Sequence, residues 1–349
     1  MAEKYRRNIY CEKEFLKLCF SKTEVDNISS SELEEYNLWR CLKAMILSAD
    51  VKLHLNISKN YLFEIEDKRP SERTFLEKKL FELSIKQRNN EIHLHLSDFV
   101  VVDNFFIPPE NEKLTAFYFT CQSREVCQKI MSEYGVFAIC PENINDFKPI
   151  LNDNGTAIDK NDEDIKSWKD ILKFCPCNSI ALVDNYILTE RKVLDENLTD
   201  IFDTLLPKKL NIEIPFQISI FSTLKDGCDS QKLFTDIAVK IESLRPELRF
   251  KLSIFKVSKD KFHDRTLVTN NFYVSCSGGF DLFKDKKSTK MTTVNIVYPF
   301  LNNSIVWTSV AYSNFIKEVS TVFNKATEFK TEYLTGFFRG SKENRLMIQ

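Results

Sequence analysis

The clearest pattern along this chain begins near residue 178, where short apolar runs alternate with amphipathic stretches. The apolar runs lack regular polar positions, which is typical of strands buried on both faces of a sheet. The predicted strands are Ser179–Leu188, Phe216–Ser222, Arg249–Val257, Arg265–Asn270, Phe272–Ser277 and Thr292–Pro299, and the predicted helices are Asn197–Leu206, Ser230–Leu244 and Ala311–Phe329. This alternation indicates an α/β domain in which helices cover both sides of a mixed sheet.

The first 150 residues mix the same two patterns with less regularity. Apolar residues at helical spacing favour helices, and runs of β-branched and aromatic residues favour strands. The predicted helices are Ser31–Ala49, Glu72–Lys86 and Arg124–Tyr134, and the predicted strands are Val51–Ile57, Tyr61–Glu66, Glu91–Val102, Leu114–Cys121 and Val136–Cys140. This part is therefore expected to be a second domain that mixes helices and strands, an α+β part of an α/β protein, with no role that the pattern reveals.

A polar stretch separates the two parts. It follows Pro149, is rich in Asp and Glu, and contains the turn signal Asn154-Gly155. A chain of 349 residues is long enough for two domains. We predict an N-terminal domain over residues 1–150, an acidic linker over 151–172, and a C-terminal domain over 173–349.

Composition changes this picture in one respect. The chain carries 49 Lys and Arg against 50 Asp and Glu, so its overall charge gives no reason to expect attraction to nucleic acid. Residues 206–293, however, contain 16 Lys and Arg against 10 Asp and Glu. The local excess suits an anionic partner, although ordinary solvated lysines on strand edges and loops explain it equally well.

The ten cysteines do not have zinc-ligand spacing. The closest pair, Cys175 and Cys177, has one residue between its members and no matching second pair. No stretch approaches 18 uninterrupted apolar residues, and the N-terminus lacks the apolar centre of a signal peptide. Free thiols without an export signal or a transmembrane segment predict a cytoplasmic protein.

One histidine pair suggests a metal site. His93 and His95 lie on the same face of a predicted strand, with Asp98 and Asp103 nearby. A third well-spaced ligand is missing. We therefore expect no metal and no other cofactor.

The candidate chemistry lies in residues 262–280, FHDRTLVTNNFYVSCSGGF. A histidine lies two positions before a cation, and a small polar side chain lies five positions after that cation. Six residues then separate this side chain from a Ser-Gly-Gly turn. A histidine can attack phosphorus or transfer a proton, and a guanidinium can hold phosphate oxygens. The catalytic candidates are His263, Arg265 and Asn270.

This order and spacing resemble the signature of the phospholipase D superfamily, H-x-K-x4-D-x6-G-S. Here Arg265, Asn270 and Ser277-Gly278 stand at the substituted positions. The strand SIALVDNYIL, which contains Asp184 and Tyr186, resembles the strand that opens many bacterial phospholipase D-like domains.

A closer resemblance is to the phospholipase D-like C-terminal domain of MIT-domain proteins. Its His-Asp-Arg and glycine-rich turn are similar to His263-Asp264-Arg265 and Gly278-Gly279-Phe280-Asp281. The likeness covers the last half of the chain. It implies ligand-binding roles for Asp184, Tyr186, Asp264, Ser277, Gly278 and Gly279.

The substitutions affect binding and catalysis differently. Arg265 can still hold a phosphate through two parallel hydrogen bonds. Asn270 is neutral and cannot stabilise a histidine cation as a carboxylate does. Enzymes of this superfamily pair two copies of the motif, whereas this chain has one, so catalysis would require a symmetric homodimer.

Three functions stay open at this point. The first is a protein that binds a phosphodiester or other anionic ligand, nucleic acid above all, without robust turnover. The second is an active, metal-independent nuclease or phosphodiesterase with a histidine nucleophile, working as a homodimer. The third is a non-catalytic structural adaptor.

Family resemblance also implies a biological setting. Abundant Asn, Lys, Phe and Ile with little Gly suggest an AT-rich bacterial genome. Phospholipase D-like proteins of this size accompany antiviral defence or mobile-element operons, so the resemblance implies a bacterial defence component with an operon-encoded protein partner.

Overall fold

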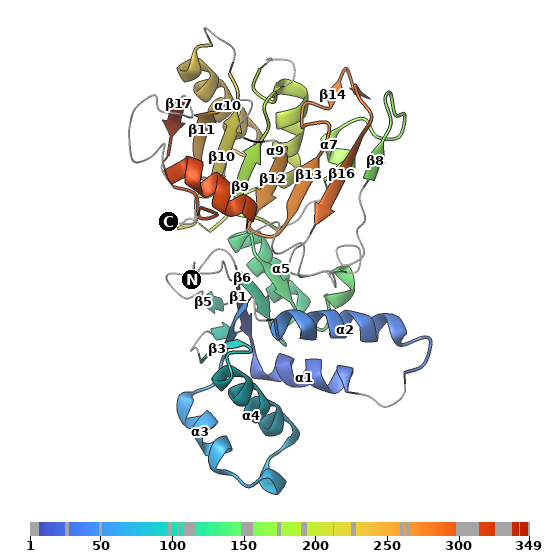
Figure 1. Cartoon of the computed structure of the whole chain (residues 1–349), viewed down its shortest axis with the longest axis vertical. Helices are drawn as coiled ribbons and strands as arrows, with labels where there is room; N and C mark the ends of the chain where they lie inside the picture. The colour runs from blue at the N-terminus through green and yellow to red at the C-terminus, as the bar shows by residue number, and fades with distance from the viewer. Residues whose placement is uncertain are drawn as a thin grey trace. The chain divides into compact units, whose positions relative to one another are not determined.

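The computed structural model of this protein describes residues 7–24, 28–48, 51–96, 100–102, 105–107, 116–147, 156–172, 176–189, 194–211, 213–224, 228–258, 262, 265–297, 314–324, 337–341 and 343–347. The chain forms two compact units (Figure 1). Unit 1 comprises Met1–Met131, Val136–Asn152 and Phe300–Ser309. Unit 2 comprises Ser132–Gly135, Asp153–Pro299 and Val310–Gln349.

Unit 1 contains a five-stranded parallel sheet in the order β3-β2-β1-β6-β7. Its strands are β1 (Arg7–Cys11), β2 (Val51–Leu55), β3 (His93–Leu96), β6 (Ala116–Phe119) and β7 (Phe137–Ile139), and a separate hairpin joins β4 (Val100–Val102) to β5 (Phe105–Ile107). The helices are α1 (Lys13–Thr23), α2 (Leu33–Ile46), α3 (Lys59–Asp67), α4 (Phe75–Arg88) and α5 (Arg124–Tyr134), with short helices η1 (Pro70–Glu72) and η2 (Ile144–Phe147). The last three residues of α5 belong to unit 2. This arrangement confirms the predicted α/β class of the chain, and the N-terminal half, expected to be its α+β part, has a parallel sheet interleaved with helices.

The strand order of unit 1 reverses beside β1. β2 and β3 follow β1 toward one edge of the sheet, whereas β6 and β7 lie on its other side. In a parallel sheet of this kind, the carboxyl ends of the strands on either side of the reversal frame a crevice. In unit 1 these are the ends of β1 and β6.

One predicted strand of unit 1 is wrong. Residues Tyr61–Glu66 belong to helix α3, although their aromatic and branched side chains favour a strand. The hydroxyl of Ser58 caps this helix by accepting a hydrogen bond from the Tyr61 amide at 3.1 Å. Ile65 is the buried residue of α3, which matches a helix that packs along one narrow face.

Unit 2 is built on an eight-stranded mixed sheet in the order β17-β11-β10-β9-β12-β13-β16-β8. β9, β10 and β11 are parallel to one another, and the other pairings are antiparallel. The strands are β8 (Thr156–Ile158), β9 (Ser179–Val183), β10 (Phe216–Ser222), β11 (Phe250–Lys256), β12 (Thr266–Thr269), β13 (Tyr273–Cys276), β16 (Thr292–Val297) and β17 (Phe337–Gly340). A small hairpin pairs β14 (Phe283–Lys284) with β15 (Lys287–Ser288).

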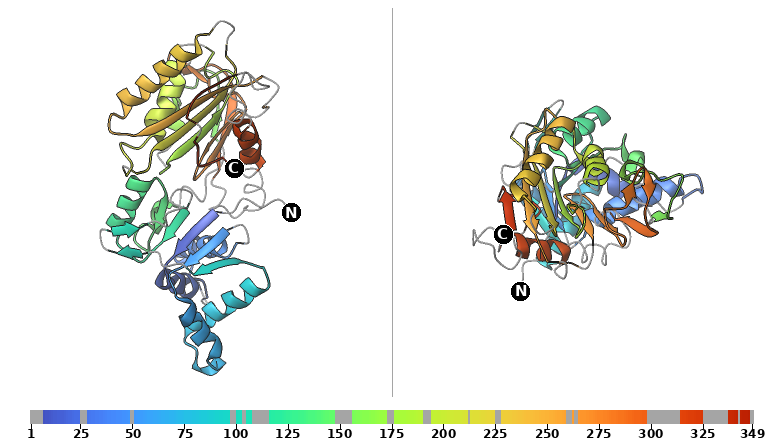
Figure 2. Two further views of the ribbon diagram at one scale, coloured as in Figure 1. Left: turned by 90° about the vertical axis from the view of Figure 1, so that its left-hand side faces the viewer. Right: turned by 90° about the horizontal axis from the view of Figure 1, so that it is seen from above.

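Helices cover both faces of this sheet. The left view of Figure 2 shows α9 (Thr199–Leu205) and α10 (Ser230–Leu244) over one face, and the helix of residues 314–324 over the other. On the second face, Phe255 of β11 packs against Phe323 with ring centroids 5.3 Å apart. The predicted mixed sheet flanked by helices is therefore confirmed.

The segment expected to be a linker takes part in the fold. Residues 151–172 include β8, which pairs with β16, and helix α7 (Trp168–Ile171). Trp168 is fully buried, and its indole nitrogen donates hydrogen bonds to Asn197 Oδ1 at 3.1 Å and to the carbonyl of Phe280 at 3.0 Å. The acidic residues made this stretch appear solvated, but its few apolar residues anchor it to the core.

Candidate functional site

Most of the residues singled out in the C-terminal half meet where the parallel strands of the unit 2 sheet end, which is its carboxyl edge. Asp184 directly follows β9, and Arg265 directly precedes β12. Thr266 pairs with Val183 in the antiparallel ladder, so Asp184 and Arg265 are neighbours at the carboxyl end of β9. The turn that follows β13, residues 277–279, lies at the same edge because β13 pairs antiparallel with β12. His263 and Asp264 lie outside the described residues.

Asp184 connects two loops of this edge. It is fully buried, and its Oδ1 accepts hydrogen bonds from the amides of Tyr186 at 2.6 Å and Ile187 at 3.0 Å. Its Oδ2 accepts a hydrogen bond from the amide of Phe280 at 2.5 Å. Burial raises the pKa of the Asp184 carboxyl, and this effect exceeds the lowering by the three amides. We infer that Asp184 positions the loops and does not bind the ligand directly.

The Ser-Gly-Gly turn is also satisfied internally. The amide of Gly278 donates to Thr292 Oγ1 at 2.7 Å, and the amide of Gly279 donates to the carbonyl of Cys276 at 3.2 Å. The next amide is the one held by Asp184. A phosphate cradle requires amides that point at the ligand, so these two glycines do not form one in this conformation.

The conformation of Gly279 explains the need for glycine there. Its φ is +89°, and a Cβ at this position would lie 3.0 Å from Oδ2 of Asp184. The glycine therefore permits the close approach that lets Asp184 reach the Phe280 amide. Ser277 has a different environment, because its side chain is exposed and its hydroxyl lies 2.9 Å from Thr292 Oγ1.

Arg265 is the cation of this edge. Its side chain is half-buried, and Nη1 donates to the carbonyl of Ser277 at 3.1 Å. The guanidinium carbon lies 5.9 Å from the centroid of the Tyr186 ring. Nε is buried and has no hydrogen-bond partner among the described residues. A guanidinium has five N–H donors, so most of its hydrogen-bonding capacity is unused within the described part of the chain.

Two buried hydroxyls at the same edge also lack hydrogen-bond partners among the described residues. They belong to Ser222, the last residue of β10, and to Thr266, the first residue of β12. An unsatisfied buried polar group costs about 1–3 kcal/mol. The carboxyl edge of the sheet therefore carries more polar groups than the described fold satisfies, as is common at functional sites.

Ser222→Ala is expected to leave the free energy of unfolding unchanged or to raise it by about 1 kcal/mol, because it removes an unpaired hydroxyl. The matched control is Ser253→Ala on β11, whose buried hydroxyl lies 2.8 Å from that of Ser219. That variant should lose about 1 kcal/mol. Urea unfolding of both variants measures the difference, and a larger loss for Ser222→Ala would contradict this account.

The structure does not bring Asn270 to this group. Asn270 follows the other end of β12, and five residues of extended chain at about 3.3 Å each place it roughly 16 Å from Arg265. Its Oδ1 accepts from the Asn178 amide at 2.9 Å, and its Nδ2 donates to the carbonyl of Gly135 at 2.8 Å. Fully buried and doubly bonded, Asn270 stabilises the amino edge of β9, and the expected pairing with Arg265 at a catalytic centre is not formed.

His95, one member of the predicted histidine pair of unit 1, has a packing role. His95 stacks on His54 with ring centroids 5.1 Å apart, and His54 stacks on Tyr10 at 4.4 Å. These residues lie in one row across β3, β2 and β1. In the described residues, no group of three or more His, Cys, Asp or Glu could hold a metal ion. Asp98 and Asp103 lie outside that part of the chain.

Sequence reasoning missed a buried carboxyl at the strand reversal of unit 1. Glu12 directly follows β1, and its Oε2 accepts from the hydroxyl of Thr120 at 2.9 Å and from the amide of Cys121 at 2.8 Å. Burial raises the pKa of the Glu12 carboxyl. Perturbed carboxyls at such crevices are frequent in functional sites. The available signal was a single Glu directly after the apolar run Ile9-Tyr10-Cys11.

Comparison with known proteins adds no relative. No protein-family model matches the chain, and no curated protein matches it. Within the described residues, no helix is long and apolar enough to cross a membrane.

Proposed function

We propose that unit 2 binds phosphodiester-type anions, nucleic acid strands above all, without hydrolysing them. The observation that carries this proposal is Arg265, a half-buried cation at the carboxyl edge of the sheet with most of its donors unused among the described residues. Tyr186 offers an aromatic ring beside it, and Ser277 is an exposed residue of the adjoining turn. A guanidinium next to an aromatic ring suits a phosphate followed by a nucleobase.

Binding without turnover is the better-supported form of this proposal. Phosphodiester hydrolysis with a histidine nucleophile requires a second group to stabilise the histidine cation and donors for the developing charge. Asn270 is a strand length away from Arg265, and the amides of Gly278 and Gly279 are already bonded. The nuclease and adaptor alternatives become outcomes of the experiment below.

A bacterial defence or mobile-element setting is part of the same proposal, with a protein partner encoded nearby. Its support is the resemblance of residues 178–300 to phospholipase D-like proteins and the AT-rich character of the composition. Cytoplasmic location and assembly into a homodimer belong to the proposal on the same basis.

Arg265→Ala is expected to weaken binding of labelled single-stranded DNA and RNA about 10- to 100-fold, because a charge-assisted hydrogen bond to phosphate contributes about 1.5–3 kcal/mol. Arg265→Lys should retain part of the affinity, since it keeps the charge and loses the planar fork. Fluorescence anisotropy across a salt series measures both, and the salt dependence should fall by about one phosphate contact.

Lys232→Ala is the matched control. Lys232 is exposed on α10, so this substitution removes one positive charge elsewhere in unit 2. Equal affinities of Arg265→Ala and wild type would refute the proposed site. Metal-free cleavage that disappears in His263→Ala would replace the binding function with the nuclease, and the mass in solution would test the homodimer on the same samples. Absence of any binding or cleavage would favour the adaptor.

A further inference from the structure

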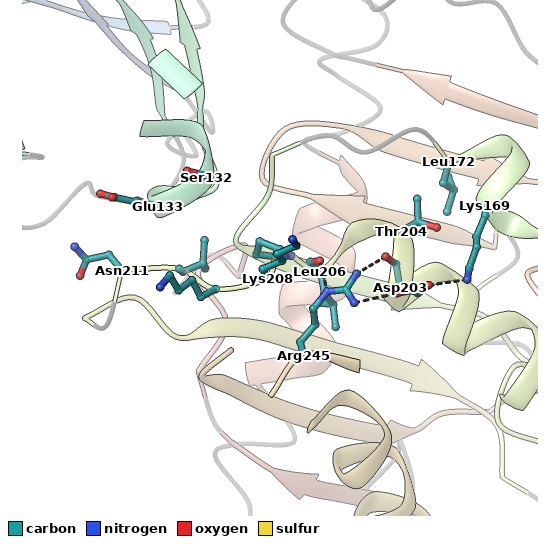
Figure 3. Close-up of a pocket in the computed structure, with 13 residues that line it drawn as sticks. Ser132, Glu133, Lys169, Leu172, Asp203, Thr204, Leu206, Lys208, Asn211 and Arg245 are labelled. Carbon is teal, nitrogen blue, oxygen red and sulfur yellow. Dashed lines mark hydrogen bonds and ion pairs between the residues drawn. The ribbon is translucent and has the colours of Figure 1, made fainter. Parts of the chain in front are cut away.

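A second candidate site of unit 2 is a pocket of about 1130 Å³ (Figure 3). All of its lining residues belong to unit 2. They are Ser132, Glu133, Lys169, Leu172, Asp203, Thr204, Leu206, Pro207, Lys208, Lys209, Leu210, Asn211 and Arg245. Pockets for small molecules measure about 300–1,000 Å³, so this one lies just above that range and has room for a whole organic ligand.

The pocket lies near the amino ends of the parallel strands, whereas Arg265 lies at their carboxyl ends. Its wall includes the end of α9 and the loop of residues 206–211, which leads toward β10. Arg245 follows the last residue of α10, on the way to β11. β10 and β11 are parallel to β9, so this is the edge where these strands begin. A ligand here would therefore be separate from one at the carboxyl edge.

Positively charged side chains outnumber negatively charged ones in the pocket lining. Asp203 is shared by two cations, with Lys169 Nζ at 2.6 Å from one oxygen and Arg245 Nη1 at 2.9 Å from the other (Figure 3). The hydrogen bond from Lys169 lowers the pKa of Asp203, and the same bond raises the pKa of Lys169, so both are charged at neutral pH. This cluster of three residues therefore carries one net positive charge.

The nearby loop adds further positive charge. Lys208 is exposed and has no ion pair among the described residues, and Lys209 pairs with Glu247 at 3.5 Å where both side chains are largely exposed. Exposed pairs of this kind hold their partners weakly. Two other carboxylates reduce the excess of positive charge. They are Glu133 in the lining and Asp200, which lies 3.7 Å from Lys169. Lys208 is therefore the cation best able to meet a ligand.

The uncharged part of the wall combines three leucines and Pro207 with the polar residues Ser132, Thr204 and Asn211. Leu172 and Leu206 are almost completely buried, and Leu210 is 9 % exposed. Arg245 is held in place by hydrogen bonds to the carbonyls of Leu206 and Asp203, in addition to its ion pair. A wall that contains leucines beside an exposed cation is complementary to a ligand with an apolar body and one acidic group.

We propose that this pocket binds an amphipathic small-molecule anion, with its apolar body against Leu206 and Leu210 and its acidic group at Lys208. The site is independent of the phosphodiester site at Arg265. Its occupant is defined by chemistry: an aromatic or aliphatic body that carries a carboxylate, sulfonate or phosphate.

The test compares two probes that share one apolar body. The anion is 8-anilino-1-naphthalenesulfonate, and the neutral form is N-phenyl-1-naphthylamine. Fluorescence titration of the full chain should show saturable binding of the sulfonate, and Lys208→Glu should weaken it about tenfold or more by reversing the charge. The neutral probe should bind more weakly and respond little to the substitution.

Lys287→Glu is the matched control, because Lys287 is exposed on β15 and outside the pocket lining. Equal loss of sulfonate binding in the two variants would overturn the proposal, since diffuse surface charge would then explain the affinity. Equal binding of the neutral probe would also overturn it. Arg265→Ala should leave sulfonate binding unchanged, so this site and the phosphodiester site can fail separately. Melting temperatures of the variants confirm that each is folded.

Discussion

Asn270→Asp is expected to destabilise unit 2 by about 3–5 kcal/mol, although it supplies the carboxylate that the phospholipase D signature has at this position. The Asn270 Nδ2 donates to the carbonyl of Gly135 at 2.8 Å, and the side chain is fully buried. Aspartate would place a carboxylate oxygen against that carbonyl and would bury a negative charge whose direct partners among the described residues are backbone groups, not cations. The loss is a large fraction of the roughly 5–15 kcal/mol that stabilises a typical domain.

The measurement is chemical unfolding of Asn270→Asp beside Asn295→Asp. Asn295 is exposed on β16 of the same sheet, so its substitution makes the same chemical change in water and should alter stability by less than about 0.5 kcal/mol. A stable Asn270→Asp protein with new phosphodiesterase activity would show that residue 270 belongs to a catalytic centre. That outcome would contradict the structural role assigned to Asn270.

A strand of unit 2 that is buried on both faces, β10, and an amphipathic helix, α10, were predictable from the apolar pattern. β10 and α10 have the predicted limits, Phe216–Ser222 and Ser230–Leu244. β9 ends at Val183, five residues earlier than predicted, because the Asp184 side chain binds the amides of two following residues. Local hydrogen bonds of this kind compete with the strand ladder, and the hydrophobicity of the next residues does not reveal them.

Unit 1 was less predictable because its organisation depends on long-range pairing. β1 and α1 were not predicted at all, and α3 was predicted as a strand. The parallel order with β1 between β2 and β6 joins segments more than 40 residues apart, and periodicity carries no information about which strands pair. The functional interest of Glu12 follows from that order, so it became visible only in the fold.

The candidate site was predictable in part of its membership and not in its geometry. Motif spacing associated Arg265 with residues 277–279, the family resemblance added Asp184, and the fold brings them together at the carboxyl end of β9. Spacing could not show that β12 is fully extended between Arg265 and Asn270, which places them at opposite ends. Nor could it show that Thr292 takes the Gly278 amide. Both facts depend on contacts made by residues outside the motif.

Asp184→Asn is expected to cost about 2–4 kcal/mol and to weaken phosphodiester binding at Arg265. The amide oxygen can replace Oδ1 toward Tyr186 and Ile187, but the NH₂ group then faces the amide of Phe280, which is also a donor. If the Asn side chain turns by 180°, its oxygen accepts from Phe280, and the backbone amides of Tyr186 and Ile187 lose their acceptor. In either orientation, the loops on both sides of Arg265 lose their common anchor. Chemical unfolding measures the loss of stability, and fluorescence anisotropy on the same protein measures the loss of affinity.

The matched control is Asp281→Asn, which removes a partly exposed ion pair with Lys290 and should cost about 1 kcal/mol or less. A pH series tests the cause. The pKa of Asp184 is raised in the fold, so its contribution to stability is complete below the ordinary aspartate pKa of about 3.9 and is lost as pH rises through the folded value. The stability advantage of wild type over Asp184→Asn should therefore be largest near pH 4 and should shrink as pH increases. An advantage that grows with pH would mean that the three amide hydrogen bonds outweigh burial, and that Asp184 is anchored as a favoured carboxylate.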